Sequence, residues 1–275
     1  MTLNPFDLSG EAFLLFYGVV FAVAAAAGIA IPGLVRPDGR DRPVADADRL
    51  ALLAGGRARF VDAVVSRLLA DGALALIGRG EFHPRRRDAG RDPAERGVLA
   101  LAAPATWKRV EEAVGPYADA VERRLVSAGL LMEASDVLRM RLGQTAPYLL
   151  PLALGLVRWE LGRVRERPVE HLGAALIATV VAAAIRWAAV DRRTRAGRAA
   201  LGRARAGTER LRRAPTTDET ALAVALYGTV VLAGSPLAHY HQLRGAGGDG
   251  GGASDTGSDD GAGGCGGGGC GGCGG

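Results

Sequence analysis

The amino-acid sequence predicts a mainly α-helical integral membrane protein with three transmembrane helices, a cytoplasmic tandem winged-helix-like α+β module and a disordered Gly/Cys-rich tail. Three features of the 275-residue chain lead to this fold class. Long uncharged runs suit membrane helices, arginines are concentrated beside those runs, and all three cysteines lie in the last 31 residues. Three cysteines are too few for a disulfide-built miniprotein, and the glycines lack the Gly-X-Y period of collagen.

The first membrane helix is predicted over residues 12–33. Its uncharged run, Ala12–Val35, has 24 residues and reaches about 36 Å at 1.5 Å per residue, enough for a hydrocarbon core of about 30 Å. No Arg or Lys precedes the run, and four arginines follow within 14 residues. By the positive-inside rule residues 1–11 are therefore expected outside the cell. A cleavable signal peptide is the alternative, but Asp7 and Glu11 stand where such peptides carry basic residues.

Two shorter apolar runs predict a helical hairpin that crosses the membrane over residues 142–162 and returns over residues 169–190. Arg186 interrupts the second run near its end, where its long side chain can reach the headgroups. Residues 191–213 follow with nine arginines and two acids, the strongest positive-inside feature of the chain. This segment is predicted to be a basic cytoplasmic topology anchor. Residues 36–141 and 191–213 are thus expected in the cytoplasm of a multi-pass cell-membrane protein.

The cytoplasmic block, residues 44–135, is predicted to be a tandem winged-helix-like module. Helices are expected over 46–54 and 57–70, and strands over 73–77 and 98–102. The segment VVSRLLADGAL (64–74) matches VERRLVSAGLL (121–131) at five of eleven positions, which suggests a repeat. Winged helices commonly bind nucleic acid, but acidic residues dilute the basic wing and base-reading side chains are few. A protein-interaction or structural role is favoured, and nucleic acid is not an expected partner.

Residues 218–243 are predicted to form an amphipathic or marginal fourth membrane helix. The uncharged run from Thr220 to Leu243 is 24 residues long, but only Ala221–Ala233 is strongly apolar. Thirteen residues suit a buried or interfacial helix better than a span. The side of the membrane that bears the tail depends on this segment.

The glycine-rich tail, residues 245–275, contains the strongest candidate functional residues. Cys265, Cys270 and Cys273 form a C-x4-C-x2-C pattern within almost pure glycine, which cannot build a packed core. Thiolates at such spacing suit a soft metal such as copper or zinc, redox crosslinking, or presentation to a cysteine-modifying enzyme. A low-complexity extension with incidental cysteines is the remaining alternative. His239 and His241, just before the tail, are weaker candidate metal ligands.

The sequence contains no phosphate-binding loop, HExxH motif or Ser/His/Asp spacing, so the protein is expected not to be an enzyme and to have no catalytic residues or bound organic cofactor. The favoured function is that of a non-enzymatic membrane protein that presents its cysteine tail for modification or soft-metal binding. The alternative is a membrane-tethered regulator or scaffold whose winged-helix-like module binds a protein partner. The expected partners are accordingly the lipid bilayer, a cysteine-modifying enzyme and a protein bound by the module.

Three stretches give the chain a family resemblance. They are residues 162–206 with the Arg167-Pro168 and Thr194–Arg198 motifs, ALAVALYGTVVLAG at 221–234, and the GGCGGGGCGGCGG end. Together they resemble a family of actinobacterial membrane proteins of unknown function that end in Gly/Cys-rich tails. The resemblance implies three transmembrane helices, an amphipathic helix at 221–234, and a tail that either binds metal or is modified by an enzyme related to multinuclear non-heme iron oxidases.

Overall fold

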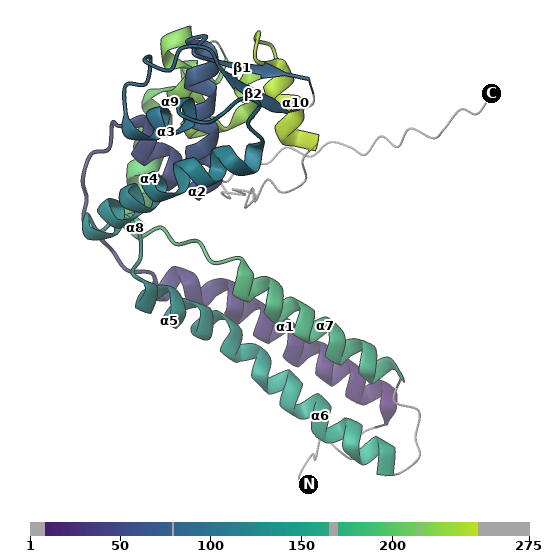
Figure 1. Ribbon diagram of the computed structural model, residues 1–275. Coiled ribbons are helices and arrows are strands. Elements are labelled where there is room, and N and C mark those ends of the chain that lie inside the picture. Colours follow the sequence, from purple (N-terminus) through teal and green to yellow (C-terminus); the bar gives the residue numbers. More distant parts are fainter. Residues whose placement is uncertain (1–8, 79, 165–169, 214, 247–275) are drawn as a thin grey trace, which may run out of the picture.

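The computed structural model describes residues 9–78, 80–164, 170–213 and 215–246. Figure 1 shows that these residues form two parts, an elongated group of parallel and antiparallel helices and a rounded body at one end of it. We call the first part the stalk and the second part the head. The stalk contains α1 (Gly10–Val35), α5 (Ala134–Thr145), the 3-10 turn η2 (Ala146–Tyr148), α6 (Leu149–Val164) and α7 (Glu170–Ala188).

Two stalk helices are long and apolar enough to cross a membrane, namely α1 and the His171–Ala188 part of α7. They coincide with the first and third predicted membrane helices. Large apolar side chains such as Leu15, Ile29 and Ile177 are exposed on their outer faces, as expected for helices that contact lipid. The first helix begins at a capped end, because the Ser9 hydroxyl accepts a hydrogen bond from the Ala12 amide.

The second predicted membrane helix is made of two helices and a turn rather than of one helix. Residues 142–162 do not form one helix, because α5 ends at Thr145 and the turn η2 intervenes before α6 begins. Pro147 lies within that turn and has no amide hydrogen to continue the α-helical bonding of α5. The resulting α6 has 16 residues and runs beside α1 and α7 (Figure 1).

Close helix contacts hold the stalk together. A Cβ placed on Gly155 would lie 2.7 Å from Leu176, and one on Gly173 would lie 2.7 Å from Trp159, so both glycines allow α6 and α7 to approach closely. The Tyr17 hydroxyl of α1 is 2.8 Å from the Thr179 hydroxyl of α7 in a buried hydrogen bond. Small residues and interhelical hydrogen bonds are the usual means by which membrane helices associate.

The head is built around α2 and α9, which lie against each other. Helix α2 (Ala47–Ala70) is kinked where Gly55 and Gly56 leave helical geometry, so it matches the two helices expected over 46–54 and 57–70. Helix α9 (Thr220–Tyr227) is buried on nearly all sides in the head. The remaining head helices are α3 (Pro93–Leu99), α4 (Trp107–Ser127), α8 (Arg195–Gly207) and α10 (Ala238–Ala246), with 3-10 turns η3 (Glu209–Arg212), η4 (Thr217–Glu219) and η5 (Thr229–Leu232).

No single membrane helix forms over 218–243, and α9 is instead a buried helix, which its thirteen-residue apolar core also allowed. Ala223, Val224, Ala225 and Leu226 have no exposed surface because they pack into the head core. A helix that is apolar all round is buried either in lipid or in a protein core, and sequence alone does not separate these cases. Helix α9 has only eight residues and packs against α2, so it is buried in the protein core.

Of the predicted winged-helix-like module, the structure confirms the strand expected over 73–77 but not the strand over 98–102 or the tandem arrangement. Strand β1 (Leu74–Ile77) pairs antiparallel with β2 (Glu81–Pro84) directly after α2. Residues 98–102, expected as a strand, instead form the end of α3 and a turn, because Asp92 caps this helix and Pro93 starts it. The two segments of the suggested repeat share a left-handed glycine after their helices, Gly72 at φ 64° and Gly129 at φ 75°. Within the described residues no second hairpin follows Gly129, only an isolated bridge between Leu131 and Arg193.

Three connections between stalk and head bond to one another, and we call them the neck: residues 36–40, 129–132 and 189–197. The Ala196 amide donates to the Asp38 carbonyl at 2.8 Å, which ties the third connection to the first. The Met132 amide donates to the Arg192 carbonyl at 2.8 Å, which ties the second to the third. The head is thus attached to the stalk through a hydrogen-bonded unit rather than through three independent linkers.

The predicted basic segment, 191–213, contributes to this neck and to the head. It forms α8 and η3, and several of its arginines pair with acids elsewhere in the chain: Arg192 with Glu122, Arg195 with Asp38, Arg203 with Asp41 and Arg210 with Glu219. Much of the positive charge expected to act as a free topology anchor is therefore neutralised by the protein itself.

Candidate functional site: the base of the cysteine tail

The predicted ligands Cys265, Cys270 and Cys273 lie outside the described residues, as does nearly all of the predicted tail. What the structure describes is the helix from which the tail departs, α10, whose last residue is Ala246. Figure 1 places α10 against the head, beside the β1–β2 hairpin. The site is therefore built from the residues that hold α10 in place.

Asp62 of α2 is the polar anchor of α10. Its Oδ1 atom accepts a hydrogen bond from the Tyr240 hydroxyl and another from Arg244 Nε, both at 2.7 Å. Asp62 is 7% exposed, so its charge is removed from most of the solvent and is compensated by Arg244. Because both partners belong to α10, one carboxylate fixes the position and rotation of the whole helix.

An aromatic cluster surrounds this anchor. The rings of Phe82, Trp107 and Tyr240 lie with their centroids 6.1 to 6.5 Å apart, and the Arg244 guanidinium lies 4.0 Å from the centre of the Trp107 ring. Burial, followed by the neighbouring charge of Asp62, raises the pKa of Tyr240 well above its usual range. Tyr240 therefore remains a neutral hydrogen-bond donor at physiological pH. Apolar area, cation–π attraction and hydrogen bonds together fasten α10.

The predicted histidine ligands do not form a metal site with each other. Two residues apart on α10, His239 and His241 point in directions roughly 200° apart around the helix. His239 is exposed, while His241 Nδ1 lies 3.1 Å from the Thr229 hydroxyl. Among the residues that the structure describes, no three His, Cys, Asp or Glu side chains are grouped as metal ligands.

The same helices determine where the tail begins. Helix α9 is buried in the head and α10 is fastened to it, so the chain remains with the head from residue 217 to residue 246. Both helices belong to the head, which lies at the end of the stalk where α1 and α7 stop (Figure 1). The tail accordingly leaves from the head, an arrangement that sequence reasoning left open.

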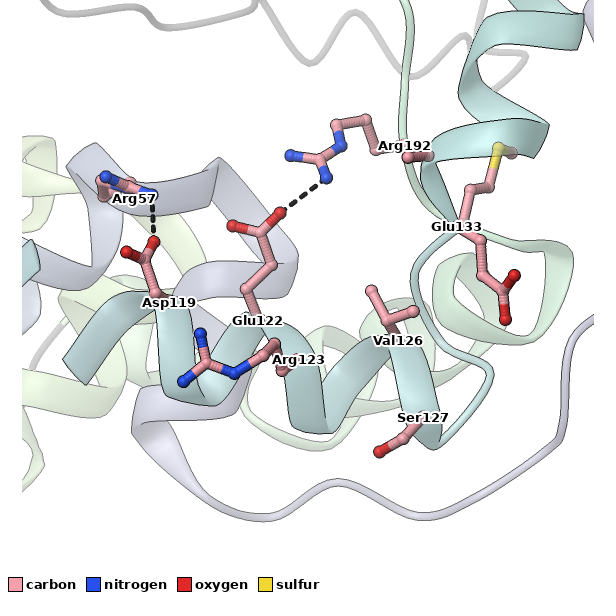
Figure 2. Close-up of a pocket in the computed structure, with 10 residues that line it drawn as sticks. Arg57, Asp119, Glu122, Arg123, Val126, Ser127, Glu133 and Arg192 are labelled. Atoms are coloured by element: carbon pink, nitrogen blue, oxygen red, sulfur yellow. Dashed lines mark hydrogen bonds and ion pairs between the residues drawn. The ribbon is translucent and has the colours of Figure 1, made fainter. Parts of the chain in front are cut away.

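A charged cleft of about 630 Å³ opens on the head surface (Figure 2). It lies between α4 and the start of α5, close to the neck. Four of its charged side chains form ion pairs with each other: Arg57 with Asp119, and Arg192 with Glu122 at 2.6 Å. The Ser127 hydroxyl at its edge donates to the Arg124 carbonyl. Such charged pairs are suited to contact with a partner of complementary charge.

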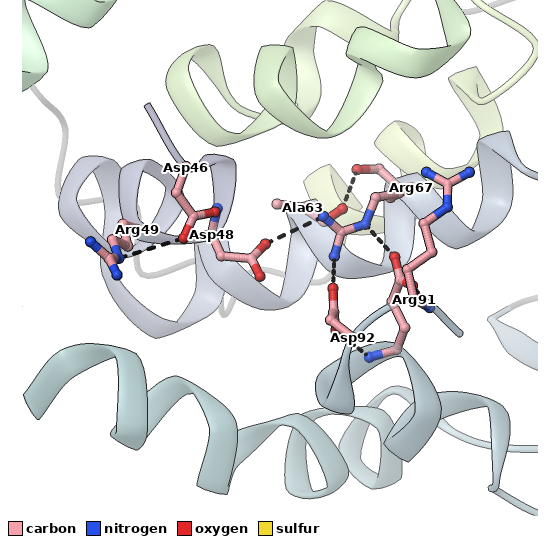
Figure 3. A network of polar contacts seen from close by, with 9 residues as sticks. Asp46, Asp48, Arg49, Ala63, Arg67, Arg91 and Asp92 are labelled. Carbon is pink, nitrogen blue, oxygen red and sulfur yellow. Dashed lines mark hydrogen bonds and ion pairs between the residues drawn. The ribbon is translucent and has the colours of Figure 1, made fainter. Parts of the chain in front are cut away.

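A second polar network fixes α3 to α2 (Figure 3). Arg67 pairs with three acids, Asp48 at 3.5 Å, Asp92 and Glu95, and Glu95 is 1% exposed. Burial raises the pKa of Asp48 from 3.8 to about 6, against the opposing attraction of Arg67. Burial opposes the charge of Arg67, but the three carboxylates outweigh it and raise its pKa. Every member has a partner, so we assign this network to the packing of α3.

Comparison of the chain with protein-family models, with curated proteins and with solved structures finds no match in any of the three.

Proposed function

We propose that this protein is a non-enzymatic, multi-pass membrane protein that holds a cysteine-bearing peptide at the cytoplasmic face of the cell membrane. The peptide is residues 245–275, and its cysteines serve as substrates of a modifying enzyme or as ligands of a soft metal such as copper or zinc. The observation that supports this proposal is the attachment of α10 to the head through Asp62, Tyr240 and Arg244. A tail that only extended the chain would not require a rigid, buried base.

The proposal includes three membrane crossings. Helices α1 and α7 both run toward the head, so the chain must return along the stalk between them, and α5, η2 and α6 make that return. With no Arg or Lys before α1 and with nine arginines after α7, the head end of the stalk is the cytoplasmic end. The tail then lies in the cytoplasm, where thiols stay reduced and available for modification or metal binding.

Sidedness of the tail is the first test. Cells that produce the full-length protein are treated with a membrane-impermeant thiol reagent before and after permeabilisation. Labelling of Cys265, Cys270 and Cys273 only after permeabilisation supports the proposal, and labelling of intact cells overturns it. Two controls start from the variant with all three cysteines replaced by serine: Ser9→Cys reports the outer face, and Ser127→Cys reports the head.

The chemical state of the tail is the second test. Intact-mass measurement of protein from native cells, with and without alkylation, should reveal a mass addition or a bound copper or zinc ion that vanishes in the Cys→Ser variant. Three unmodified and freely alkylated cysteines without metal would refute the presentation function even if the tail were cytoplasmic.

A membrane-tethered scaffold is the second candidate function, and the charged cleft favours it. In this case the head, the block predicted as winged-helix-like, binds a protein partner through the cleft of Figure 2. Deletion of residues 245–275 would then leave the cellular phenotype unchanged, whereas Arg123→Glu, at an exposed cleft position, would abolish it. The opposite pattern favours tail presentation.

A further inference from the structure

Two arginines at the head end of the stalk, Arg141 and Arg186, have no carboxylate partner among the residues that the structure describes. Within the described part of the chain, Arg186 Nη2 donates to the Gly28 carbonyl at 2.8 Å and to Gln144 Oε1 at 3.2 Å. Arg141 lies with its guanidinium 5.6 Å from the centre of the Trp187 ring. The Nε atoms of both arginines are buried and have no hydrogen-bond partner among the described residues. The protein thus positions two positive charges without neutralising them.

Two arginines in and beside the nearby neck do have a carboxylate partner. Asp191 pairs there with Arg36 at 3.4 Å and with Arg198 at 2.8 Å. Asp191 thus compensates Arg36 and Arg198, whereas no described carboxylate pairs with Arg141 or Arg186. A buried or half-buried cation needs compensation, and an anion from outside the protein can supply it.

The position of Arg141 and Arg186 along the stalk helices indicates which kind of anion they bind. Gly28, to which Arg186 bonds, is seven residues before the end of α1, or about 10 Å along the helix. Arg186 and Trp187 lie in the last turn of α7, the helix whose apolar part ends at Ala188. Tryptophan is enriched at the level of lipid headgroups, and arginine pairs well with phosphate through its planar fork of donors. The phosphates of membrane lipids occur at this depth.

We propose that Arg141 and Arg186, with Trp187 beside them, form a binding site for the phosphate of an anionic phospholipid in the leaflet that faces the head. The inference rests on the proposed insertion of the stalk in a membrane. Gln144 positions Arg186: its side chain is 1% exposed, its amide nitrogen donates to the Arg186 carbonyl, and its Oε1 accepts from the Arg186 guanidinium. The lipid phosphate supplies the negative charge that the protein lacks here.

The test uses full-length protein in micelles that contain equal amounts of phosphatidylglycerol and phosphatidylcholine, with bound lipid counted by native mass spectrometry. A basic residue near a membrane surface contributes about fivefold to the binding of an anionic lipid. Wild-type protein should retain phosphatidylglycerol preferentially, and Arg141→Gln should reduce that preference by roughly fivefold. Arg139→Gln is the matched control, because Arg139 is exposed and lies roughly 200° around α5 from Arg141. It should leave the preference unchanged.

The outcomes separate this inference from the proposed function. Failure of the wild-type protein to insert in phosphatidylcholine vesicles refutes the membrane proposal and this site with it. Insertion without a preference for phosphatidylglycerol, or an equal loss in Arg139→Gln, refutes only the site. Excess inorganic phosphate should not displace the bound lipid, and full displacement would identify a free-phosphate site instead. Arg186→Lys, which keeps the charge but not the two-bond geometry, should fall between wild type and Arg141→Gln.

Discussion

Arg36, the first residue after α1, pairs with Asp191, the third residue after α7, at 3.4 Å between Nη1 and Oδ2. The same guanidinium nitrogen donates to the carbonyls of Asp191 and Arg193. The Arg36 side chain is 4% exposed, and burial lowers its pKa, although Asp191 opposes this effect. One buried arginine therefore connects the chain where it first leaves the stalk with the chain where it finally returns.

We expect this contact to contribute far more to stability than a surface pair between the same two regions. In a double-mutant cycle of Arg36→Ala and Asp191→Ala, measured by denaturant unfolding of detergent-solubilised protein, the coupling free energy should be about 1–3 kcal/mol. Arg203 and Asp41 also link the neck region to α8, but both are more than half exposed, and their coupling should be below about 1 kcal/mol. Equal coupling in the two cycles would contradict a structural role for Arg36.

The hydroxyl of Tyr240 should determine how firmly the base of the tail is held. Tyr240→Phe removes one hydrogen bond to Asp62 but keeps the ring and the Arg244 pair, so the cost should be about 1 kcal/mol. Hydrogen–deuterium exchange should accelerate about fivefold in α10 and little in α4. His239→Ala, at an exposed position of the same helix, should leave the exchange unchanged. Uniform acceleration across the head would argue against a local anchor.

Protonation of Asp48 should stabilise the head in mildly acidic solution. Its pKa is 3.8 when unperturbed and about 6 in the folded protein, so the folded state binds the proton more tightly than the unfolded state. Stability should therefore rise as pH falls from about 6 to about 4, and the full penalty of the buried charge should be present above pH 6.

The substitution Asp48→Asn tests this pH dependence directly. Asparagine keeps an acceptor for Arg67 and removes the buried charge, so at neutral pH the variant should be more stable by about 1–2 kcal/mol. Its melting temperature should vary less between pH 4 and 6 than that of the wild type. Asp46→Asn is the control, since Asp46 is exposed and asparagine caps helices equally well. A destabilised Asp48→Asn variant would show that the ion pair outweighs the cost of burial.

Local features of the sequence predicted much of this architecture. The apolar length of Ala12–Val35 predicts α1, the Gly55–Gly56 pair predicts the break in α2, and Gly72 predicts its end. Each of these depends on a few neighbouring residues, namely on helix length or on backbone freedom at glycine. Such local rules operate before any tertiary contact forms.

The elements that were predicted wrongly depend on contacts between distant residues. The apolar stretch of α9 resembles a marginal membrane segment until α2 is known to cover it. Arg59 of α2 donates to the Val224 carbonyl of α9, and 165 positions separate the two residues. Residues 98–102 have the composition of a strand, but the Asp92 cap and the Arg67 network hold α3 in place, and this region forms the end of α3 and the turn after it. The anchor pair of Asp62 and Tyr240 is separated by 178 positions, and no spacing rule brings the two together.

Helix α8 provides a final test of the neck, because two of its glycines occupy opposite environments. A Cβ on Gly197 would lie 2.1 Å from the Leu130 carbonyl oxygen, a backbone atom that cannot move without opening the neck. Gly197→Ala should therefore cost about 2–3 kcal/mol or more. Gly202 is exposed on the same helix with nothing within 4 Å of its added Cβ, so Gly202→Ala should stabilise the protein by about 0.5–1 kcal/mol.

Thermal unfolding of the two full-length variants in detergent measures this difference in sign. Hydrogen–deuterium exchange should locate the loss in Gly197→Ala at the amides of Met132, Thr194 and Ala196, which bond across the neck. If the neck connections were independent linkers, Gly197→Ala would behave like Gly202→Ala, since alanine is the better helix former at both positions. Destabilisation confined to Gly197→Ala therefore requires the close contact of α8 with Leu130.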